Sequence, residues 1–296
     1  MSLLKTLKFI TNHPLNREHK LKSILRFAKW QVGSRLVPGA VVYEWVGGSK
    51  FLVQRGDTGL TGNIYTGLHE FPDMSYLLHV LRSDDLFVDI GANVGSYTLL
   101  ACSAIGAKGV AFEPVPATFE RLMENIRINH LEETVTCINK GLGAESGTLS
   151  FTSDSDTMNH ALAPGESAFN PIAVEVTTLN AALKGATPAL IKIDVEGFET
   201  PVLEGAEEVL SQDSLHSVIM ELNGSGDRYG YDETRIVEMM FDLGFRTYSY
   251  DPFARALINL DGKNHDKDNT LFIRDELTVL DRLKDSPNIS VNGGLF

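Results

Sequence analysis

Cysteine is scarce in this sequence, which has only Cys102 and Cys137 among its 296 residues. Both lie in apolar surroundings, and their spacing is not that of a metal site or a redox pair. We therefore expect reduced, buried thiols, as in a cytoplasmic protein. Long apolar runs are also missing, so the sequence predicts no membrane-spanning helix. Lysines interrupt the apolar residues at the N-terminus and no small-residue cleavage site follows, so we expect no signal peptide.

Positive charge is in deficit over most of the chain, because 26 Lys and Arg stand against 39 Asp and Glu, a formal net charge of −13. Phosphate contacts need clustered Lys and Arg, so most of the chain is not expected to bind nucleic acid. An acidic body favours a neutral or cationic ligand. The exception is the segment that ends at Arg35, which carries eight basic residues and one acid, Glu18.

Apolar residues in this basic segment recur at helical spacing. They are Leu21, Ile24, Leu25, Ala28 and Val32. A basic amphipathic helix could rest on an anionic membrane or on an acidic partner surface. The alternative, which we favour, is a helix packed against the main domain with its charges in water. If the helix rests on an anionic membrane, the protein would be cytoplasmic but attached peripherally to that membrane.

We expect three regions: a basic helix and β-hairpin extension over residues 1–60, a main domain over residues 61–285 and a loose tail over residues 286–296. The stretch "AVVYEWVGGSKFLVQRG" is typical of a hairpin. Residues 57–72, rich in Gly and Thr, are expected to form a loop, and Asp73 is expected to be the N-cap of the following helix.

Short apolar runs then alternate with helical stretches. The runs are Leu86–Ile90, Gly109–Phe112, Val135–Ile138, Leu190–Ile193 and Val218–Leu222. This alternation predicts an α/β fold with a parallel sheet covered by helices on both faces. The later runs "FRTYSYDP" and "NTLFIRD" predict a closing antiparallel pair.

The stretch "FVDIGANVGSYTLL" places Asp89, Gly91 and Gly95 at a turn from a strand into a helix. Backbone N–H groups gather at such a turn and bind ligands there, although the glycines could serve the turn alone. The spacing is not the G-x-G-x-x-G of dinucleotide sites, which disfavours a nicotinamide dehydrogenase. An acid at the strand end suits a cationic ligand without phosphates, and S-adenosylmethionine fits that description. Glu113, at the end of the next strand, stands where an acid accepts hydrogen bonds from ribose hydroxyls.

Three motifs together resemble the FkbM family of S-adenosylmethionine-dependent methyltransferases: "VDIGANVGSYT", "AFEPVPATFERLMENIRIN" and "IKIDVEGFETPVLEGA". They occur in order between about Tyr65 and about Asp275. The resemblance implies a class I methyltransferase (Rossmann-like) fold: a seven-stranded, mostly parallel sheet with helices on both faces and its last strand antiparallel.

The resemblance also implies a cofactor site. Its expected members are Asp89, Gly91, Asn93 and Gly95 in the first loop, Glu113 and Pro114 at the ribose, and Tyr65 and Glu70 closing over the cofactor. Gly141 and Leu142 follow the third strand and would lie near the adenine, although an ordinary turn explains them equally well.

Acids at the sheet edge are the candidate catalytic residues. Asp194 and Glu196 follow the fourth strand and Glu221 ends the fifth, so all three should meet at one edge of the sheet. The resemblance implies that the motif of Asp194 and Glu196 faces the transferred methyl group. Asp194 is the first candidate for the base, and His69 is an alternative base or a solvated loop residue. Glu196 could instead shape its loop through an ion pair or a helix cap. The three acids could also hold a divalent cation, but no histidine stands beside them at ligand spacing, and we predict no metal.

These residues favour methylation of a hydroxyl on a sugar or small metabolite. The alternative is a non-catalytic cofactor-binding or assembly module at a membrane-associated complex. The acceptor, a small molecule or saccharide, would be selected by the loops at residues 152–173 and 251–268, which contain Asn159, His160, Arg255 and His265.

Overall fold

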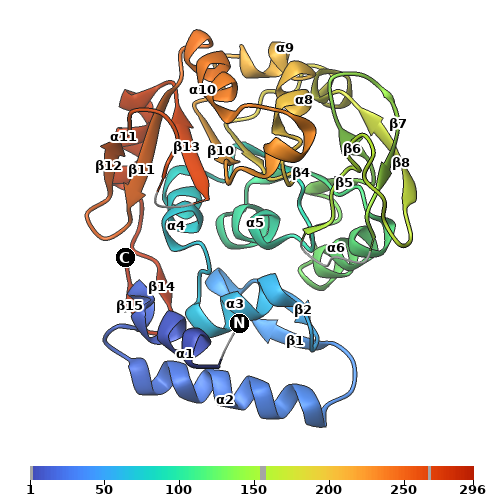
Figure 1. The fold of residues 1–296 in the computed structure, drawn as a ribbon. Helices are drawn as coiled ribbons and strands as arrows, with labels where there is room; N and C mark the ends of the chain where they lie inside the picture. The colour runs from blue at the N-terminus through green and yellow to red at the C-terminus, as the bar shows by residue number, and fades with distance from the viewer. Residues whose placement is uncertain (1–2, 154–157, 266–267) are drawn as a thin grey trace.

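The centre of the molecule is an eight-stranded sheet in the order β12-β11-β13-β10-β9-β3-β4-β5 (Figure 1). The computed structural model describes residues 3–153, 158–265 and 268–296, so a few positions in each acceptor loop lie outside the described residues. The parallel strands are β3 (Leu86–Ile90), β4 (Lys108–Phe112), β5 (Val135–Ile138), β9 (Leu190–Ile193) and β10 (Ser217–Glu221). Their carboxyl ends therefore meet at one edge.

The sheet closes with antiparallel strands, as the sequence predicts. Strand β13 (Asn269–Ile273) runs antiparallel to both β10 and β11 (Arg246–Asp251). The expected number of seven strands is too low by one. After β11 the chain turns back and forms β12 (Ala256–Asn259), which pairs with β11 at the edge of the sheet.

Helices cover both faces of the sheet, and the predicted α/β class is confirmed. One face carries α4 (Phe71–Val80), α5 (Ser96–Leu99) with the π-helix Leu100–Ile105, α6 (Pro116–Ile128) and α11 (Glu276–Asp285). The other carries α7 (Leu179–Leu183), α8 (Glu199–Glu204), α9 (Glu207–Leu210) and α10 (Glu233–Asp242). Successive strand residues alternate between faces, so Phe87 joins the first core and Val88 the second.

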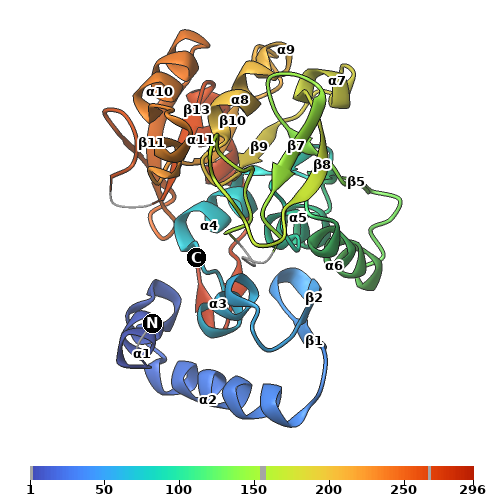
Figure 2. The ribbon, with the colours of Figure 1, turned by 45° about the vertical axis from the view of Figure 1, so that its right-hand side comes forward.

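Two smaller sheets flank the central one. The expected hairpin forms from β1 (Val41–Glu44) and β2 (Lys50–Val53), joined through the 3-10 turn Val46–Gly48. The second sheet has the order β6-β8-β7 and consists of β6 (Gly141–Leu142), β7 (Gly147–Phe151) and β8 (Ile172–Thr177). Figure 2 shows β7 and β8 in front of the central sheet. A further 3-10 helix, Ser225–Tyr229, follows β10.

The expectation of a loop over residues 57–72 is wrong. Residues Thr58–Thr66 form helix α3, which buries Leu60 and Ile64. Burial of these side chains outweighs the low helix propensity of the glycines around them. Helix α4 also begins at Phe71 rather than after Asp73, so Glu70 takes the N-cap position and the Asp73 side chain is buried within the first turn.

The N-terminal helices lie at the far end of the molecule from the central sheet (Figures 1 and 2). They are α1 (Leu3–Asn12), the 3-10 helix Pro14–Asn16 and α2 (Lys20–Leu36). Arg26 and the buried Asn16 both donate hydrogen bonds to the Tyr65 carbonyl, at 3.0 Å each, and these bonds fasten the segment to α3. Across the described part of the chain, no helix is long and apolar enough to cross a bilayer.

The C-terminal tail is ordered, which corrects the expectation of a loose end. Strands β14 (Ser290–Val291) and β15 (Gly294–Leu295) pair with each other, and Phe296 is buried. The Phe296 ring contacts the rings of Phe71 and His79, at centroid distances of 5.2 and 5.4 Å. A polar composition suggested mobility, but one terminal aromatic side chain anchors the segment. Cys102 and Cys137 are both free thiols, but only Cys102 is buried as expected, and Cys137 is half-buried.

Candidate functional site

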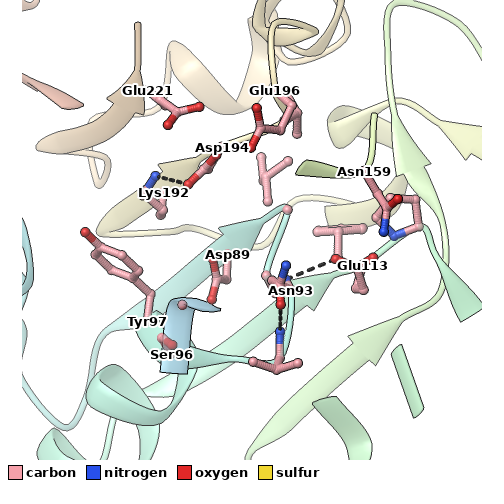
Figure 3. A pocket seen from close by; sticks show the side chains of 18 of the residues that line it. Asp89, Asn93, Ser96, Tyr97, Glu113, Asn159, Lys192, Asp194, Glu196 and Glu221 are labelled. Carbon is pink, nitrogen blue, oxygen red and sulfur yellow. Dashed lines mark hydrogen bonds and ion pairs between the residues drawn. The ribbon is translucent and has the colours of Figure 1, made fainter. Parts of the chain in front are cut away.

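A pocket of about 440 Å³ opens at the carboxyl ends of β3, β4, β9 and β10 (Figure 3). Most of the residues expected from the sequence line it. They are His69, Glu70, Asp89, Gly91, Asn93, Glu113, Pro114, Gly141, Leu142, Asp194, Glu196 and Glu221. The order of the parallel strands brings these distant segments together, because each strand delivers its following loop to the same edge.

Asp89 lies near the end of β3 and is buried beneath the pocket. One of its carboxylate oxygens accepts hydrogen bonds from the backbone N–H of Thr98, at 3.0 Å, and from the Thr98 hydroxyl, at 2.5 Å. These bonds join the strand end to the first turn of α5. Burial raises the pKa of Asp89 to about 6, against the effect of the Thr98 hydrogen bonds.

Glu113 closes the other side of the loop that follows β3. Its two carboxylate oxygens accept hydrogen bonds from the backbone N–H of Asn93, at 3.0 Å, and of Val115, at 2.9 Å. Asn93 has a positive φ of 51°, an uncommon conformation that its own side chain supports by accepting a bond from the Val94 N–H. Burial raises the pKa of Glu113 to about 7.

Lys192 is a buried cation within β9 and lies on the face of the sheet that carries α5. Its ammonium donates to Asp194, at 2.9 Å, and to Asn269, at 3.1 Å, and it lies 5.3 Å from the centre of the Tyr97 ring. Burial alone would lower the pKa of Lys192, but the carboxylates of Asp194 and Glu70 raise it above its ordinary value. Lys192 therefore stays charged and holds the Asp194 carboxylate in place.

Asp194, Glu196 and Glu221 meet as predicted, with ligand oxygens within 4.8 Å of one another. Burial, followed by the charge of Asp194, raises the pKa of Glu221 to about 9 and raises the pKa of Glu196 as well. One Glu221 oxygen is buried without a hydrogen-bond partner among the described residues. The raised pKa values favour a shared proton within the cluster, and the expectation of no metal stays a prediction.

The loop after β9 is shaped by Glu199. Its carboxylate accepts hydrogen bonds from the backbone N–H groups of Val195 and Gly197, both at 3.2 Å. Glu196 itself has a positive φ of 56°, and its side chain lines the pocket. A strained conformation held beside a cavity is typical of a functional residue. Glu199 thus shapes this loop, and the choice between a catalytic and a structural role for Glu196 stays a prediction.

Tyr65 and Gly95 do not line the pocket, so the structure leaves these two expected cofactor contacts outside it. The Tyr65 hydroxyl accepts a hydrogen bond from Gln31, so this residue joins α3 to α2. Gly95 has a φ of 91° and precedes α5, and a Cβ there would lie 2.7 Å from Leu122. Its role is to let the loop enter the helix, which the sequence alone could not separate from ligand contact.

His69 lines the rim of the pocket in an exposed position. Its ring contacts the ring of Phe9, at a centroid distance of 5.4 Å, and its backbone N–H donates to Asn63. Its role as an alternative base stays a prediction.

Tyr97 and Asn269 are site residues that the sequence argument missed. The Tyr97 hydroxyl donates to Glu70 at 2.5 Å, and Asn269 links Lys192 to the buried Asp73, at 3.4 Å. A signal existed for each: Tyr97 belongs to the loop motif, and a lysine inside the apolar run "LIKI" requires buried polar partners.

Asp73 provides a test of these buried charges. Burial, and then the charge of Glu70, raises the pKa of Asp73 to about 7. A folded-state pKa above the unfolded value stabilises the protein below about pH 4, and this contribution is lost as the pH rises through 7. We expect Asp73→Asn to gain up to about 3 kcal/mol in unfolding free energy over the wild type between pH 5 and pH 8.

Urea unfolding of the ligand-free protein at both pH values measures this difference. Asp281→Asn, at an exposed position on α11, is the matched control and should follow the wild type. Parallel pH profiles for Asp73→Asn and the wild type would contradict the assignment.

Comparison with known proteins gives three findings. The family described as "Methyltransferase FkbM domain" matches residues 89–247. The hexuronic acid methyltransferase AglP of Haloferax volcanii is 33% identical over 153 residues, which cover 51% of this chain and 61% of that protein. "Methyltransferase 1" of Beauveria bassiana is 29% identical over 183 residues, which cover 53% of this chain and 72% of that protein. The chain thus matches less than two thirds of the Haloferax protein.

Among solved structures, P. horikoshii TYW2 in complex with MeSAdo is similar in fold. The identity is 16%, the TM-score is 0.41, and the match covers 80% of this chain and 72% of that one.

Proposed function

Because the chain belongs to the FkbM methyltransferase family, we propose that it transfers the methyl group of S-adenosylmethionine to a hydroxyl oxygen of a sugar or small metabolite. The observation that carries the proposal is the pocket, where Glu113 lies on one side and the cluster of Asp194, Glu196 and Glu221 on the other. The relative AglP is named for a hexuronic acid acceptor, which supports a saccharide.

The cofactor would span the pocket from Glu113 to the acid cluster. Glu113 would accept hydrogen bonds from the ribose diol, as carboxylates at this strand end do in related folds. Apolar groups of Leu142 and Phe151, which line the same pocket, offer a surface for the adenine. Asp89 and the cluster would stabilise the positive sulfonium and amino group through their negative charge.

Methyl transfer is an in-line displacement in which the carbon–sulfur bond breaks as the carbon–oxygen bond forms. The enzyme must align the acceptor oxygen and take its proton. The ammonium of Lys192 holds the Asp194 carboxylate in place, while burial beside Asp194 favours the protonated form of Glu221. The two acids divide the roles in this proposal: Asp194 accepts the proton, and Glu221 holds a hydrogen bond to the acceptor.

The alternative of a non-catalytic module is not favoured, because the relatives are described as methyltransferases and the acids of the cluster are all present. The test is calorimetric titration with S-adenosylmethionine, followed by transfer of a labelled methyl group to neutral sugars, hexuronic acids and small alcohols. Saturable binding and label in at least one acceptor support the proposal. Binding of S-adenosylmethionine without transfer to any of these acceptors would favour the non-catalytic module. Absence of binding would contradict both the methyltransferase and the cofactor-binding module.

Glu113 should make cofactor binding depend on pH. Its pKa is raised to about 7 in the free protein, and only the ionised carboxylate accepts both ribose hydrogen bonds. Affinity for S-adenosylmethionine should therefore rise up to about tenfold between pH 6 and pH 8. We expect Glu113→Gln to bind about tenfold more weakly at pH 8 and to show a flatter profile.

The measurement is titration calorimetry at both pH values, in buffers that differ in ionisation enthalpy so that proton release is counted. Glu238→Gln, exposed on α10, is the control and should bind like the wild type. If Glu113→Gln kept the wild-type affinity and the wild-type change of affinity with pH, Glu113 would not be the ribose contact. The other proposed cofactor contacts would be unaffected by that result.

A further inference from the structure

Helix α2 presents a row of apolar side chains to solvent. Leu21, Leu25, Val32 and Leu36 are 72, 60, 59 and 77% exposed, and Ala28 between them is also exposed. Their separations of four, three, four and four residues place them on one face of the helix. A continuous exposed apolar row on a folded protein marks an interaction surface.

The opposite face of α2 makes the contacts with the rest of the protein. Ser23 is fully buried, and Phe27 and Trp30 pack against the main core. Gln31 donates to the Tyr65 hydroxyl on α3, at 2.7 Å. The helix therefore packs against the main domain with most of its charges in water, as the favoured expectation from sequence has it, but it does so through these residues and not through the apolar row. The helix carries two faces with apolar character, and the inner one uses different residues.

Basic side chains border the exposed row. Lys22 and Lys29 lie on one flank and Arg35 on the other, and α2 contains no acidic residue. At the end of the helix, Arg35 and Arg55 line one surface hollow together with Leu36 and Val37. This arrangement stands on a chain whose net charge is −13. Positive charge is thus concentrated beside the exposed apolar row, against the balance of the rest of the chain.

We propose that the outer face of α2 docks the protein on an anionic lipid surface. The apolar row enters the boundary between headgroups and acyl chains, and the flanking lysines and arginines meet the negatively charged headgroups. The acidic remainder of the protein is repelled by the same surface, which fixes the orientation with α2 toward the membrane. The inference does not depend on the proposed methyl transfer.

A second copy of the chain suits this face less well. Helices that pair through a row of this spacing usually carry opposite charges at the flanking positions. Here the flanks are basic, so two α2 helices would bring like charges together. Charge complementarity therefore favours an anionic lipid surface over a second α2 helix as the partner of this face.

Flotation of the full-length protein with vesicles tests the proposal. We expect binding to phosphatidylcholine vesicles that contain about one third phosphatidylglycerol, little binding to phosphatidylcholine alone, and release at high salt. Because a lysine near such a surface is worth about fivefold in affinity, Lys22→Ala with Lys29→Ala should weaken binding about twentyfold. The triple variant Leu21→Ser, Leu25→Ser and Val32→Ser should lose at least about tenfold.

Leu277→Ser removes an equally exposed leucine from α11 and is the matched control, which should bind like the wild type. Thermal melting checks that each variant is folded, as expected for changes at exposed positions. Absence of binding to the anionic vesicles, or equal binding by the triple variant, would overturn the proposal. A dimer in light scattering that the triple variant converts to monomer, without vesicle binding, would identify a second copy as the occupant.

Discussion

Replacing Gly91 with alanine is expected to destabilise the protein by about 4 kcal/mol or more and to abolish cofactor binding. A Cβ on Gly91 would lie 1.8 Å from the carbonyl oxygen of Asp194, a distance that no packing can accommodate. Gly91 also has a φ of 78°, a backbone conformation that residues other than glycine adopt only with strain. The loop after β3 or the loop after β9 must therefore move, and both of these loops line the pocket.

Chemical unfolding measures the loss of stability, and titration with S-adenosylmethionine measures the loss of binding. Gly185→Ala is the matched control, because Gly185 has a φ of 83° but no atom of the described residues lies within 4 Å of the point that a Cβ would occupy. It should cost only the conformational strain, about 1 kcal/mol. A Gly91→Ala protein no less stable than Gly185→Ala would show that the two loops are not in contact.

The contact at Gly91 explains how the site is held together. Gly91 and Ala92 both donate backbone hydrogen bonds to the Phe112 carbonyl, and Asp194 donates its N–H to the Ile90 carbonyl. The loops after β3, β4 and β9 are therefore joined through the backbone as well as through the Glu113 carboxylate. A site built from rigid strand ends would keep the proposed cofactor and the acids at fixed separations, which the proposed methyl transfer requires.

The sequence predicted the pocket well because parallel strands deliver their loops to one edge. Once the runs at β3, β4, β9 and β10 were recognised, Asp89, Glu113, Asp194 and Glu221 had to meet, and they do. Local spacing sufficed because each acid directly follows its strand or lies at its end. The same logic located the antiparallel closure but missed β12, whose pairing depends on a turn after β11.

Features that depend on tertiary contacts could not be predicted in this way. Helix α3 forms because Leu60 and Ile64 are buried, and the tail is ordered because Phe296 finds a place between Phe71 and His79. Helical spacing identified the apolar row of α2 but could not tell which face turns inward, since Phe27 and Trp30 offer a competing inner face. Helix propensity and hydrophobic periodicity carry no information about the shape of the surface against which a segment packs.

The second large effect is expected for Asp194→Asn, which should lower kcat about a thousandfold. The amide keeps the shape of the side chain, but it cannot accept the proton of the acceptor hydroxyl. It also leaves Lys192 without its ion-pair partner at 2.9 Å. Affinity for S-adenosylmethionine should change much less than kcat, because the proposed cofactor contacts Asp89 and Glu113 are unchanged.

The measurement is the rate of methyl transfer, as a function of pH, to the acceptor that is found among the neutral sugars, hexuronic acids and small alcohols. Thermal melting checks that the variant is folded. Glu196→Gln is the matched control within the same cluster, because Glu196 shares the pocket but is not the carboxylate that pairs with Lys192. Its kcat should fall about tenfold or less. If Glu221→Gln instead gave the largest loss and Asp194→Asn kept most of the activity, the roles of the two acids would be reversed. The proton would then pass to Glu221, and because the pKa of Glu221 is raised to about 9, kcat should rise with pH toward 9.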